Sequence, residues 1–186
     1  MTIHIPNVHH RALLIIDMQQ GFMNASTRHL ATKIPQIAQM YRHVFASQLV
    51  FSSRAPKTQV VCHSSFIEGS PETKLSLIWP ENVSKTFYLF AKHHYTCIGS
   101  ALSSLMMKNN IHHIDLCGVD SEACVLKTAL DFYEMGFSFR VLESLCASSQ
   151  GPAYHEAAMD LLRTVCGPQH MLIDRPIQTY LPGSES

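Results

Sequence analysis

The sequence predicts an α/β fold, in which a six-stranded, mostly parallel and doubly wound sheet lies between two layers of helices. Short, continuously apolar runs recur along the chain, as in strands that are covered on both faces. Stretches with apolar residues at helical spacing separate most of these runs, and Gly and Pro residues mark the boundaries. Alternation of this kind builds a three-layer α/β/α domain of Rossmann-like topology with right-handed crossovers.

The first half of the chain supplies two strands, one helix and a long connection. A first strand is predicted at residues 11–17, an apolar run that ends in a carboxylate. A helix is predicted over residues 34–46, where Pro35 suits the first turn, and a second strand over residues 49–54. The pattern then fades up to residue 85, apart from a short helix near residues 72–77. A connection of this length often forms a lid or a pocket wall.

The second half of the chain alternates more regularly. Strands are predicted at residues 86–91, 113–117, 137–142 and 170–173, and helices at residues 99–110, 121–135 and 152–165. Ser121 suits the N-cap of the second of these helices, and Gly136 is a natural residue to end it. The tail at residues 176–186 is polar, contains Pro and Gly, and is predicted to be mobile.

Length and composition indicate one domain, residues 1–186, with its core at about residues 11–174. Acidic and basic residues balance at fourteen each without a run of like charge, which argues against a nucleic-acid or anionic-membrane partner. No apolar run approaches transmembrane length, and the first residues lack the pattern of a signal peptide. We therefore expect a soluble, cytoplasmic protein.

Cysteine and histidine usage predicts neither disulfides nor a metal. The six cysteines form no CxxC pair, in a chain large enough to fold without disulfides. The twelve histidines include adjacent pairs such as His93 and His94, whose side chains point to different sides of a strand or helix. Such pairs are poor chelates without ligands from elsewhere. No cofactor is expected.

Residues 116–129 form the most informative stretch. An apolar run stops at Gly118, turns, and continues as a helix with Cys124 in its first turn. Unpaired backbone N–H groups and the helix dipole favour a thiolate there, and the same N–H groups can hold an oxyanion. The alternative is that Cys124 is a small buried apolar residue.

Two further side chains follow predicted strands. Asp17 follows the first strand and Lys92 the third, while Cys124 follows the fourth. The carboxyl ends of parallel strands meet at one edge of a sheet, where ligands bind, so these three side chains are expected to converge. A lysine enclosed beside a carboxylate and a thiol stabilises negative charge. The alternatives are a turn residue for Asp17 and a solvated charge for Lys92.

Three segments resemble the isochorismatase-like cysteine hydrolases, the family of nicotinamidases, N-carbamoylsarcosine amidases, ureidoacrylate hydrolases and isochorismatase itself. Residues 14–22 resemble the opening strand of the family with its Asp-Met-Gln. Residues 91–95 resemble its strand-end Lys with a downstream Tyr, and residues 118–125, followed by Thr-Ala at 128–129, resemble its nucleophile block. The segments occur in the family's order, and the resemblance covers about residues 11–150.

The resemblance implies a role for each of the three side chains. Asp17 would act as the general base, Lys92 as the electrostatic stabiliser and Cys124 as the nucleophile. The backbone N–H groups of Ala123 and Cys124 would hold the oxyanion.

The resemblance also implies a cis peptide between Val119 and Asp120. Substrate selectivity is expected to depend on the loop from about residue 54 to residue 85 and on the side chains near Phe22, Trp79 and Tyr95.

The chain departs from the metal-using nicotinamidases after its second predicted strand. Those relatives carry an Asp-x-His motif and a further His; here residues 53–57 read Ser-Arg-Ala-Pro-Lys, with only His63 nearby. The departure argues against a metal and against nicotinamidase activity. Isochorismatase itself lacks the nucleophilic Cys, so Cys124 argues for attack on a carbonyl carbon.

The sequence thus predicts a hydrolase that cleaves the C–N bond of a small amide, ureide or carbamoyl compound through a thioester. One alternative is a thiol redox switch or binding module, with Cys97 or Cys117 as partner of Cys124. The other is a catalytically silent scaffold of the same fold. The resemblance further suggests a homo-oligomer.

Overall fold

The computed structural model describes residues 11–52, 66–79 and 86–172. One sheet runs through it, with the strand order β3-β2-β1-β4-β5-β6 and every neighbouring pair parallel. This is the order of a doubly wound dinucleotide-binding sheet, so the predicted fold class is confirmed. The strands are β1 Ala12–Ile16, β2 His43–Leu49, β3 Thr86–Lys92, β4 His113–Gly118, β5 Ser138–Cys146 and β6 Met171–Leu172.

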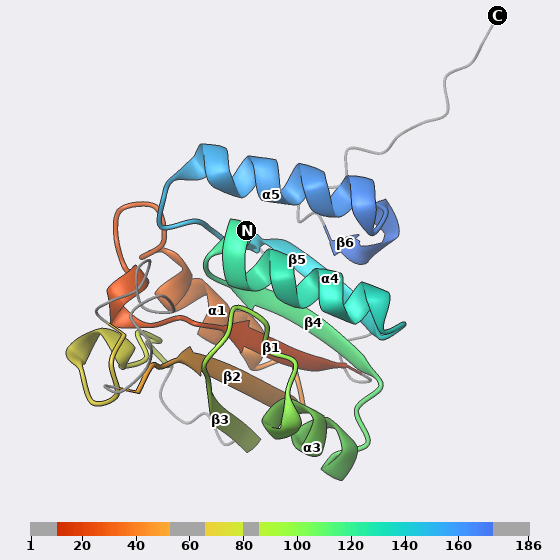
Figure 1. Cartoon of the computed structure of the whole chain (residues 1–186), viewed down its shortest axis with the longest axis horizontal. Coiled ribbons are helices and arrows are strands. Elements are labelled where there is room, and N and C mark those ends of the chain that lie inside the picture. Colours follow the sequence, from red (N-terminus) through yellow and green to blue (C-terminus); the bar gives the residue numbers. More distant parts are fainter. Residues whose placement is uncertain (1–10, 53–65, 80–85, 173–186) are drawn as a thin grey trace, which may run out of the picture.

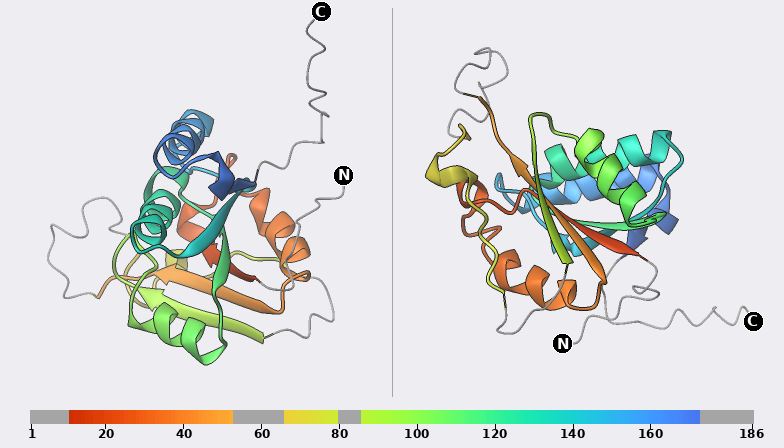
Figure 2. Two further views of the ribbon diagram at one scale, coloured as in Figure 1. Left: turned by 90° about the vertical axis from the view of Figure 1, so that its right-hand side faces the viewer. Right: turned by 90° about the horizontal axis from the view of Figure 1, so that it is seen from below.

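Helices cover both faces of the sheet (Figure 1). Figure 2 shows α1 on one face and α3, α4 and α5 on the other. None of the helices in the described part of the chain is long and apolar enough to cross a membrane. The α-helices are α1 Leu30–Ala38, α3 Ser100–Lys108, α4 Leu126–Glu134 and α5 Pro152–Val165. Three 3₁₀ turns, η2 Gln20–Phe22, η3 Pro71–Thr73 and η5 Pro168–His170, and the π-helical segment η4 Ser121–Val125 complete the described helical structure.

The central strands hold the core. All five residues of β1 are fully buried, and so are the residues of β4 from Ile114 onward. Continuous burial is what both faces covered by helices require, and it explains why these strands read as unbroken apolar runs. Helix α5 has the predicted bounds, and Gly136 follows the end of α4 with a φ of 71°, a left-handed conformation that favours glycine.

The bounds predicted for the first helix and the second strand are wrong. The helix begins at Leu30 and ends at Ala38, so Pro35 lies inside it instead of in its first turn. Residues 44–46, assigned to the helix, are buried in β2, which ends where the predicted strand began. The error arose because β2 is buried on both faces, and an unbroken apolar run is compatible with either element.

Smaller differences concern element ends. The short helix predicted near residues 72–77 is the 3₁₀ turn η3, and β5 continues four residues beyond its predicted end to Cys146. The mobile tail predicted at residues 176–186 and the segment 53–57 with His63 lie outside the described residues.

Gly118 ends β4 at a close approach to β1. Its φ is 120°, and a Cβ atom placed on it would lie 2.1 Å from the carbonyl oxygen of Ile16. Only glycine fits this position without moving the backbone. The last residues of β1 and β4 are therefore held side by side, immediately before Asp17 and the nucleophile segment.

Candidate active site

The three predicted side chains meet at the carboxyl edge of the sheet. Asp17 follows β1, Lys92 is the last residue of β3, and Cys124 lies in η4 after β4. Strands β1 and β4 are neighbours at the point where the strand order reverses, which is where open α/β sheets form their ligand crevice.

Lys92 is the centre of this cluster. Its Nζ atom lies 2.7 Å from Oδ2 of Asp17 and 3.3 Å from Sγ of Cys124. Nζ also donates to the backbone carbonyls of His94 at 2.9 Å and Tyr95 at 3.0 Å. The three side chains are buried, with residue exposures of 0% for Asp17, 7% for Lys92 and 1% for Cys124. The ammonium group is thus fixed between a carboxylate and a thiol.

Ser47 on β2 positions the carboxylate of Asp17. Its hydroxyl donates to Oδ1 of Asp17 at 2.7 Å and accepts the backbone N–H of the same residue at 3.2 Å. Asp17 has a φ of 49°, in the left-handed region that few residues other than Gly, Asn and Asp adopt. The sequence interpretation missed Ser47, because it ended the first helix at residue 46 and left Ser47 outside any strand.

Gln19 ties the segment after β1 to its surroundings. Its side-chain nitrogen donates to the carbonyls of Leu49 and Thr73, both at 3.0 Å, and its side-chain oxygen accepts the N–H of Leu49 at 2.8 Å. These three bonds hold the segment that contains Asp17 against the end of β2 and against η3. The Gln of the Asp-Met-Gln motif therefore has a positioning role here.

The predicted thiolate is wrong for the protein without a ligand. Burial raises the pKa of Cys124 well above 9.0, and the Asp17 carboxylate raises it further, while Lys92 lowers it. Desolvation outweighs the favourable field of Lys92 and the helix start, because the thiol is almost fully enclosed. The site at rest therefore holds a neutral thiol.

Lys92 itself is held as an ammonium ion. Burial alone would lower its pKa, but the charge of Asp17 and the neighbouring Cys124 and Cys97 raise it overall. The resting cluster is consequently an ion pair of Asp17 and Lys92 with a thiol beside it.

A second thiol lies behind the cluster. Sγ of Cys97 lies 3.5 Å from the hydroxyl of Ser47, and its backbone N–H donates to Thr128 Oγ1 at 3.0 Å. Burial raises the pKa of Cys97 to about 11, so this thiol is also neutral near pH 7. Cys117 lies fully buried in β4, and the cysteines among the described residues are all free.

The nucleophile segment begins with a cis peptide between Val119 and Asp120. The carbonyl of Asp120 accepts the backbone N–H groups of Ala123 at 3.2 Å and Val125 at 3.1 Å. The predicted N-cap is wrong, because Asp120 precedes η4 and the hydroxyl of Ser121 instead pairs with Nδ1 of His155 at 2.8 Å.

A polar network supports the nucleophile segment from behind. The two carboxylate oxygens of Asp120 accept the N–H of Ser149 at 2.6 Å and its hydroxyl at 2.7 Å. Burial raises the pKa of Asp120 to about 6 despite these two bonds. The hydroxyl of Ser148 donates to Glu122 at 2.8 Å, which ties the segment after β5 to η4.

The three predicted pocket residues have different locations. Phe22 is buried in η2, where its ring packs at a tilt of 31° against Phe66 with 4.4 Å between the ring centroids. Tyr95 is 43% exposed and contacts Lys92 through its carbonyl. Trp79 packs edge-on against Phe87, five residues before Lys92 on the same strand. A strand rises about 3.3 Å per residue, so the structure places Trp79 away from the cluster.

No group of three or more His, Cys, Asp or Glu side chains that could hold a metal ion occurs within residues 11–52, 66–79 and 86–172.

The parallel sheet with a carboxylate, an ammonium and a thiol at its switch point defines an α/β protein of isochorismatase-like architecture. Residues 11–170 match the isochorismatase domain. The chain belongs to the isochorismatase-like hydrolase family.

Individual relatives in this family share about a quarter of their aligned residues with the chain. Human isochorismatase domain-containing protein 2 is 24% identical over 136 residues, which are 73% of this chain and 59% of that protein. The protein of the same description from Bos taurus is 25% identical over 136 residues, with the same coverage. The chain thus matches about three fifths of the length of these relatives.

Solved structures share the fold at low identity. The pyrazinamidase/nicotinamidase from Streptococcus mutans has a TM-score of 0.69 at 21% identity, covering 87% of this chain and 99% of that one. PnC1 from L. infantum, solved in complex with nicotinate, has a TM-score of 0.71 at 20% identity, covering 92% of this chain and 99% of that one.

Proposed function

We propose that the chain is a cysteine hydrolase that cleaves the C–N bond of a small amide, ureide or carbamoyl compound through a thioester on Cys124. The observation that carries the proposal is the position of the Lys92 ammonium, 2.7 Å from the Asp17 carboxylate and 3.3 Å from the Cys124 thiol. A base, a fixed positive charge and a nucleophile in one buried cluster are the parts that covalent acyl transfer needs.

The first step is proton transfer coupled to attack. Because the resting thiol is neutral, the Asp17 carboxylate accepts its proton as sulfur attacks the carbonyl carbon. Lys92 keeps its charge throughout and offsets the negative charge that passes from Asp17 to the thiolate and then to the carbonyl oxygen. The proton and the charge therefore move within the cluster.

The oxyanion is assigned to the N–H groups of Ala123 and Cys124 at the start of η4. The Ala123 N–H donates to the Asp120 carbonyl at 3.2 Å, near the long end of the usual range for a hydrogen bond. When the oxyanion forms, this N–H would donate to the oxyanion, either in place of the Asp120 carbonyl or in addition to it. A donor of this kind typically contributes about 3–4 kcal/mol to the transition state.

The second half of the reaction restores the enzyme. Protonated Asp17 gives its proton to the leaving nitrogen, and the C–N bond breaks to leave a thioester on Cys124 and free ammonia or amine. Asp17 then takes a proton from a water molecule that attacks the thioester. The C–S bond breaks, the acid product leaves, and the proton returns to the sulfur.

Structural neighbours support the amide class of substrate. The solved structures that share the fold include the pyrazinamidase/nicotinamidase from Streptococcus mutans and a nicotinamidase from Bacillus subtilis, which are named after small aromatic amides. Their identity to this chain is about 20%, so they support the bond type and leave the particular amide open.

The test is ammonia release from a panel of small primary amides, ureides and carbamoyl compounds. We expect the wild type to turn over at least one of them and Cys124→Ala to lose the activity while it keeps its thermal unfolding temperature. Cys166→Ala is the matched control, because Cys166 is similarly buried but follows the end of α5, away from the cluster. Failure of the whole panel, or more than a few per cent residual activity in Cys124→Ala, would sink the proposal.

The alternative function, a thiol redox switch at Cys124, requires a different chemical state of the thiol from the proposed hydrolase. It requires a reactive thiolate and a second thiol, whereas burial raises the pKa of both Cys124 and Cys97. Peroxide treatment and peptide mapping separate the two functions, since a specific disulfide between Cys124 and Cys97 would support the switch.

A further inference from the structure

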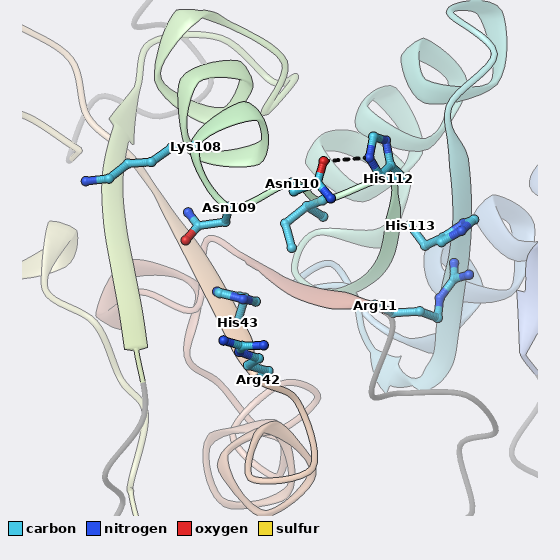
Figure 3. Close-up of a pocket in the computed structure, with 9 residues that line it drawn as sticks. Arg11, Arg42, His43, Lys108, Asn109, Asn110, His112 and His113 are labelled. Carbon is cyan, nitrogen blue, oxygen red and sulfur yellow. Dashed lines mark hydrogen bonds between the residues drawn. The ribbon is translucent and has the colours of Figure 1, made fainter.

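A cavity lies at the opposite edge of the sheet from Cys124. Its volume is about 710 Å³, and it is formed by the starts of β1, β2 and β4 together with the end of α3 (Figure 3). Strand β1, five residues long, separates this edge from Asp17, a span of roughly 16 Å. The cavity is therefore distinct from the hydrolase cluster.

The lining of the cavity is cationic. No Asp or Glu among the described residues lines it. The lining includes three cationic side chains, Arg11, Arg42 and Lys108, and three histidines, His43, His112 and His113. The whole chain has balanced acidic and basic residues, so the cationic character is local and is produced by the fold.

A single buried carboxylate next to the cavity, Asp115, offsets only part of the positive charge of the lining. Arg11 pairs with the buried carboxylate of Asp115 at 2.6 Å, but the same carboxylate also pairs with Arg140 at 2.6 Å. One negative charge thus serves two guanidinium groups. Arg42 and Lys108 form no ion pair with another described residue.

His43 lies beside Arg42 in the lining of the cavity and has one enclosed ring nitrogen. Its Nδ1 atom is buried and has no hydrogen-bond partner among the described residues. Leaving a buried polar atom unpaired is costly, and such atoms in folded proteins ordinarily have a partner. Figure 3 shows His43 beside Arg42 at the start of β2, below Asn109 at the end of α3. A ligand in the cavity would lie beside the Arg42 guanidinium group and the accessible part of His43, whereas the Nδ1 atom itself is enclosed.

We propose that this cavity binds a small molecule that carries a phosphate group. Arg42 and Lys108 give the cavity two positive charges without a described counter-ion, and the resulting field favours a dianion such as a phosphate monoester, which carries close to two negative charges at pH 7. The guanidinium fork of Arg42 suits pairs of phosphate oxygens, whereas Lys108 points away from Arg42 and contributes through its charge (Figure 3). The volume accommodates the organic part of a ligand as well as its phosphate. This inference does not depend on the hydrolase activity.

The test is calorimetric titration with inorganic pyrophosphate, ribose 5-phosphate and ribose. We expect saturable, salt-sensitive binding of the two phosphate probes and none of ribose. Arg42→Gln should weaken binding about tenfold or more, and Lys108→Gln, which removes a more distant charge, should weaken it less. Both side chains are exposed, so neither change should lower the thermal unfolding temperature.

Two controls locate the site. Arg28→Gln removes one exposed positive charge outside the cavity lining and should leave binding unchanged. Cys124→Ala should also leave it unchanged, because Cys124 is at the other edge of the sheet. The proposal is overturned if neither phosphate probe binds, if Arg42→Gln binds as tightly as Arg28→Gln, or if citrate binds as tightly as the phosphate probes.

Discussion

The Nζ atom of Lys92 lies 2.7 Å from Oδ2 of Asp17, and both side chains are buried. A buried ion pair is costly to form but more costly to break, because removal of one partner leaves the other charged and enclosed. The pair is therefore part of the fold as well as of the proposed chemistry. Variants of either residue must be judged by stability and by activity.

Breaking the pair should destabilise the protein strongly. We expect Lys92→Met to lower the free energy of unfolding by about 3–5 kcal/mol, because the Asp17 charge remains buried without a partner. In an Asp17→Asn background the same change should cost clearly less, since no charge is left behind. Asn is the suitable replacement, because it tolerates the φ of 49° at this position. Urea unfolding of the four proteins measures the coupling, and additive effects would contradict it.

Ser47 should affect turnover through Asp17. Ser47→Ala removes the hydroxyl that donates to Oδ1 at 2.7 Å, and we expect kcat to fall about tenfold or more with little change in KM. Ser47→Thr keeps the hydroxyl and suits a strand, so it should recover most of the lost kcat. The measurement is steady-state kinetics on the amide with the highest turnover. A Thr variant as slow as the Ala variant would show that the hydroxyl has no positioning role.

The Cys124 thiol should react slowly with alkylating agents at neutral pH. Because burial and Asp17 raise its pKa, we expect the midpoint of iodoacetamide alkylation to lie above pH 9.0 in the native protein. Asp17→Asn should lower this midpoint by removing a negative charge beside the sulfur. Peptide mass mapping across pH follows each cysteine separately. Rapid alkylation of Cys124 at pH 7 in the wild type would be incompatible with a neutral resting thiol.

Asp120 should make the fold less stable as the pH rises through the weakly acidic range. Its pKa is raised from 3.8 to about 6, so between these values the folded protein binds more protons than the unfolded chain. The free energy of unfolding then falls as the pH rises, by at most about 3 kcal/mol, and the loss is complete above about pH 6.

The matching variant is Asp120→Asn, which cannot ionise. We expect its unfolding free energy to change less than that of the wild type between pH 4 and pH 7, as measured by urea unfolding at each pH. Groups that titrate alike in both proteins cancel in this comparison. Parallel pH profiles of the two proteins would show that Asp120 does not contribute.

Much of the fold follows from local patterns in the sequence. The bounds of α5 follow from Pro152, apolar spacing and the Gly-Pro that ends it, and the approach of Asp17, Lys92 and Cys124 follows from their places after strands of one parallel sheet. The register of β2 does not follow in this way. The apolar residues 44–46 suit a buried helix as well as a buried strand. Only their pairing with β1 and β3 determines that they form a strand.

The parts of the site that were missed depend on three-dimensional contacts. Ser47 matters because β2 lies between β1 and β3 and brings its hydroxyl to Asp17, 30 positions earlier in the chain. The ionisation of Cys124 depends on enclosure, which position at a helix start does not reveal. The cationic cavity likewise gathers residues from distant segments, none of which forms a run of like charge in the sequence.

The formation of a thioester on Cys124 is tested by the mass of the Cys124 peptide after acid quenching during turnover of the amide with the highest turnover. We expect a gain equal to the acyl group of that amide, on Cys124 and on no other cysteine, and no ammonia release by a folded Cys124→Ala protein. Continued hydrolysis by Cys124→Ala, or an acyl group on a different residue, would contradict the assignment of Cys124 as the nucleophile.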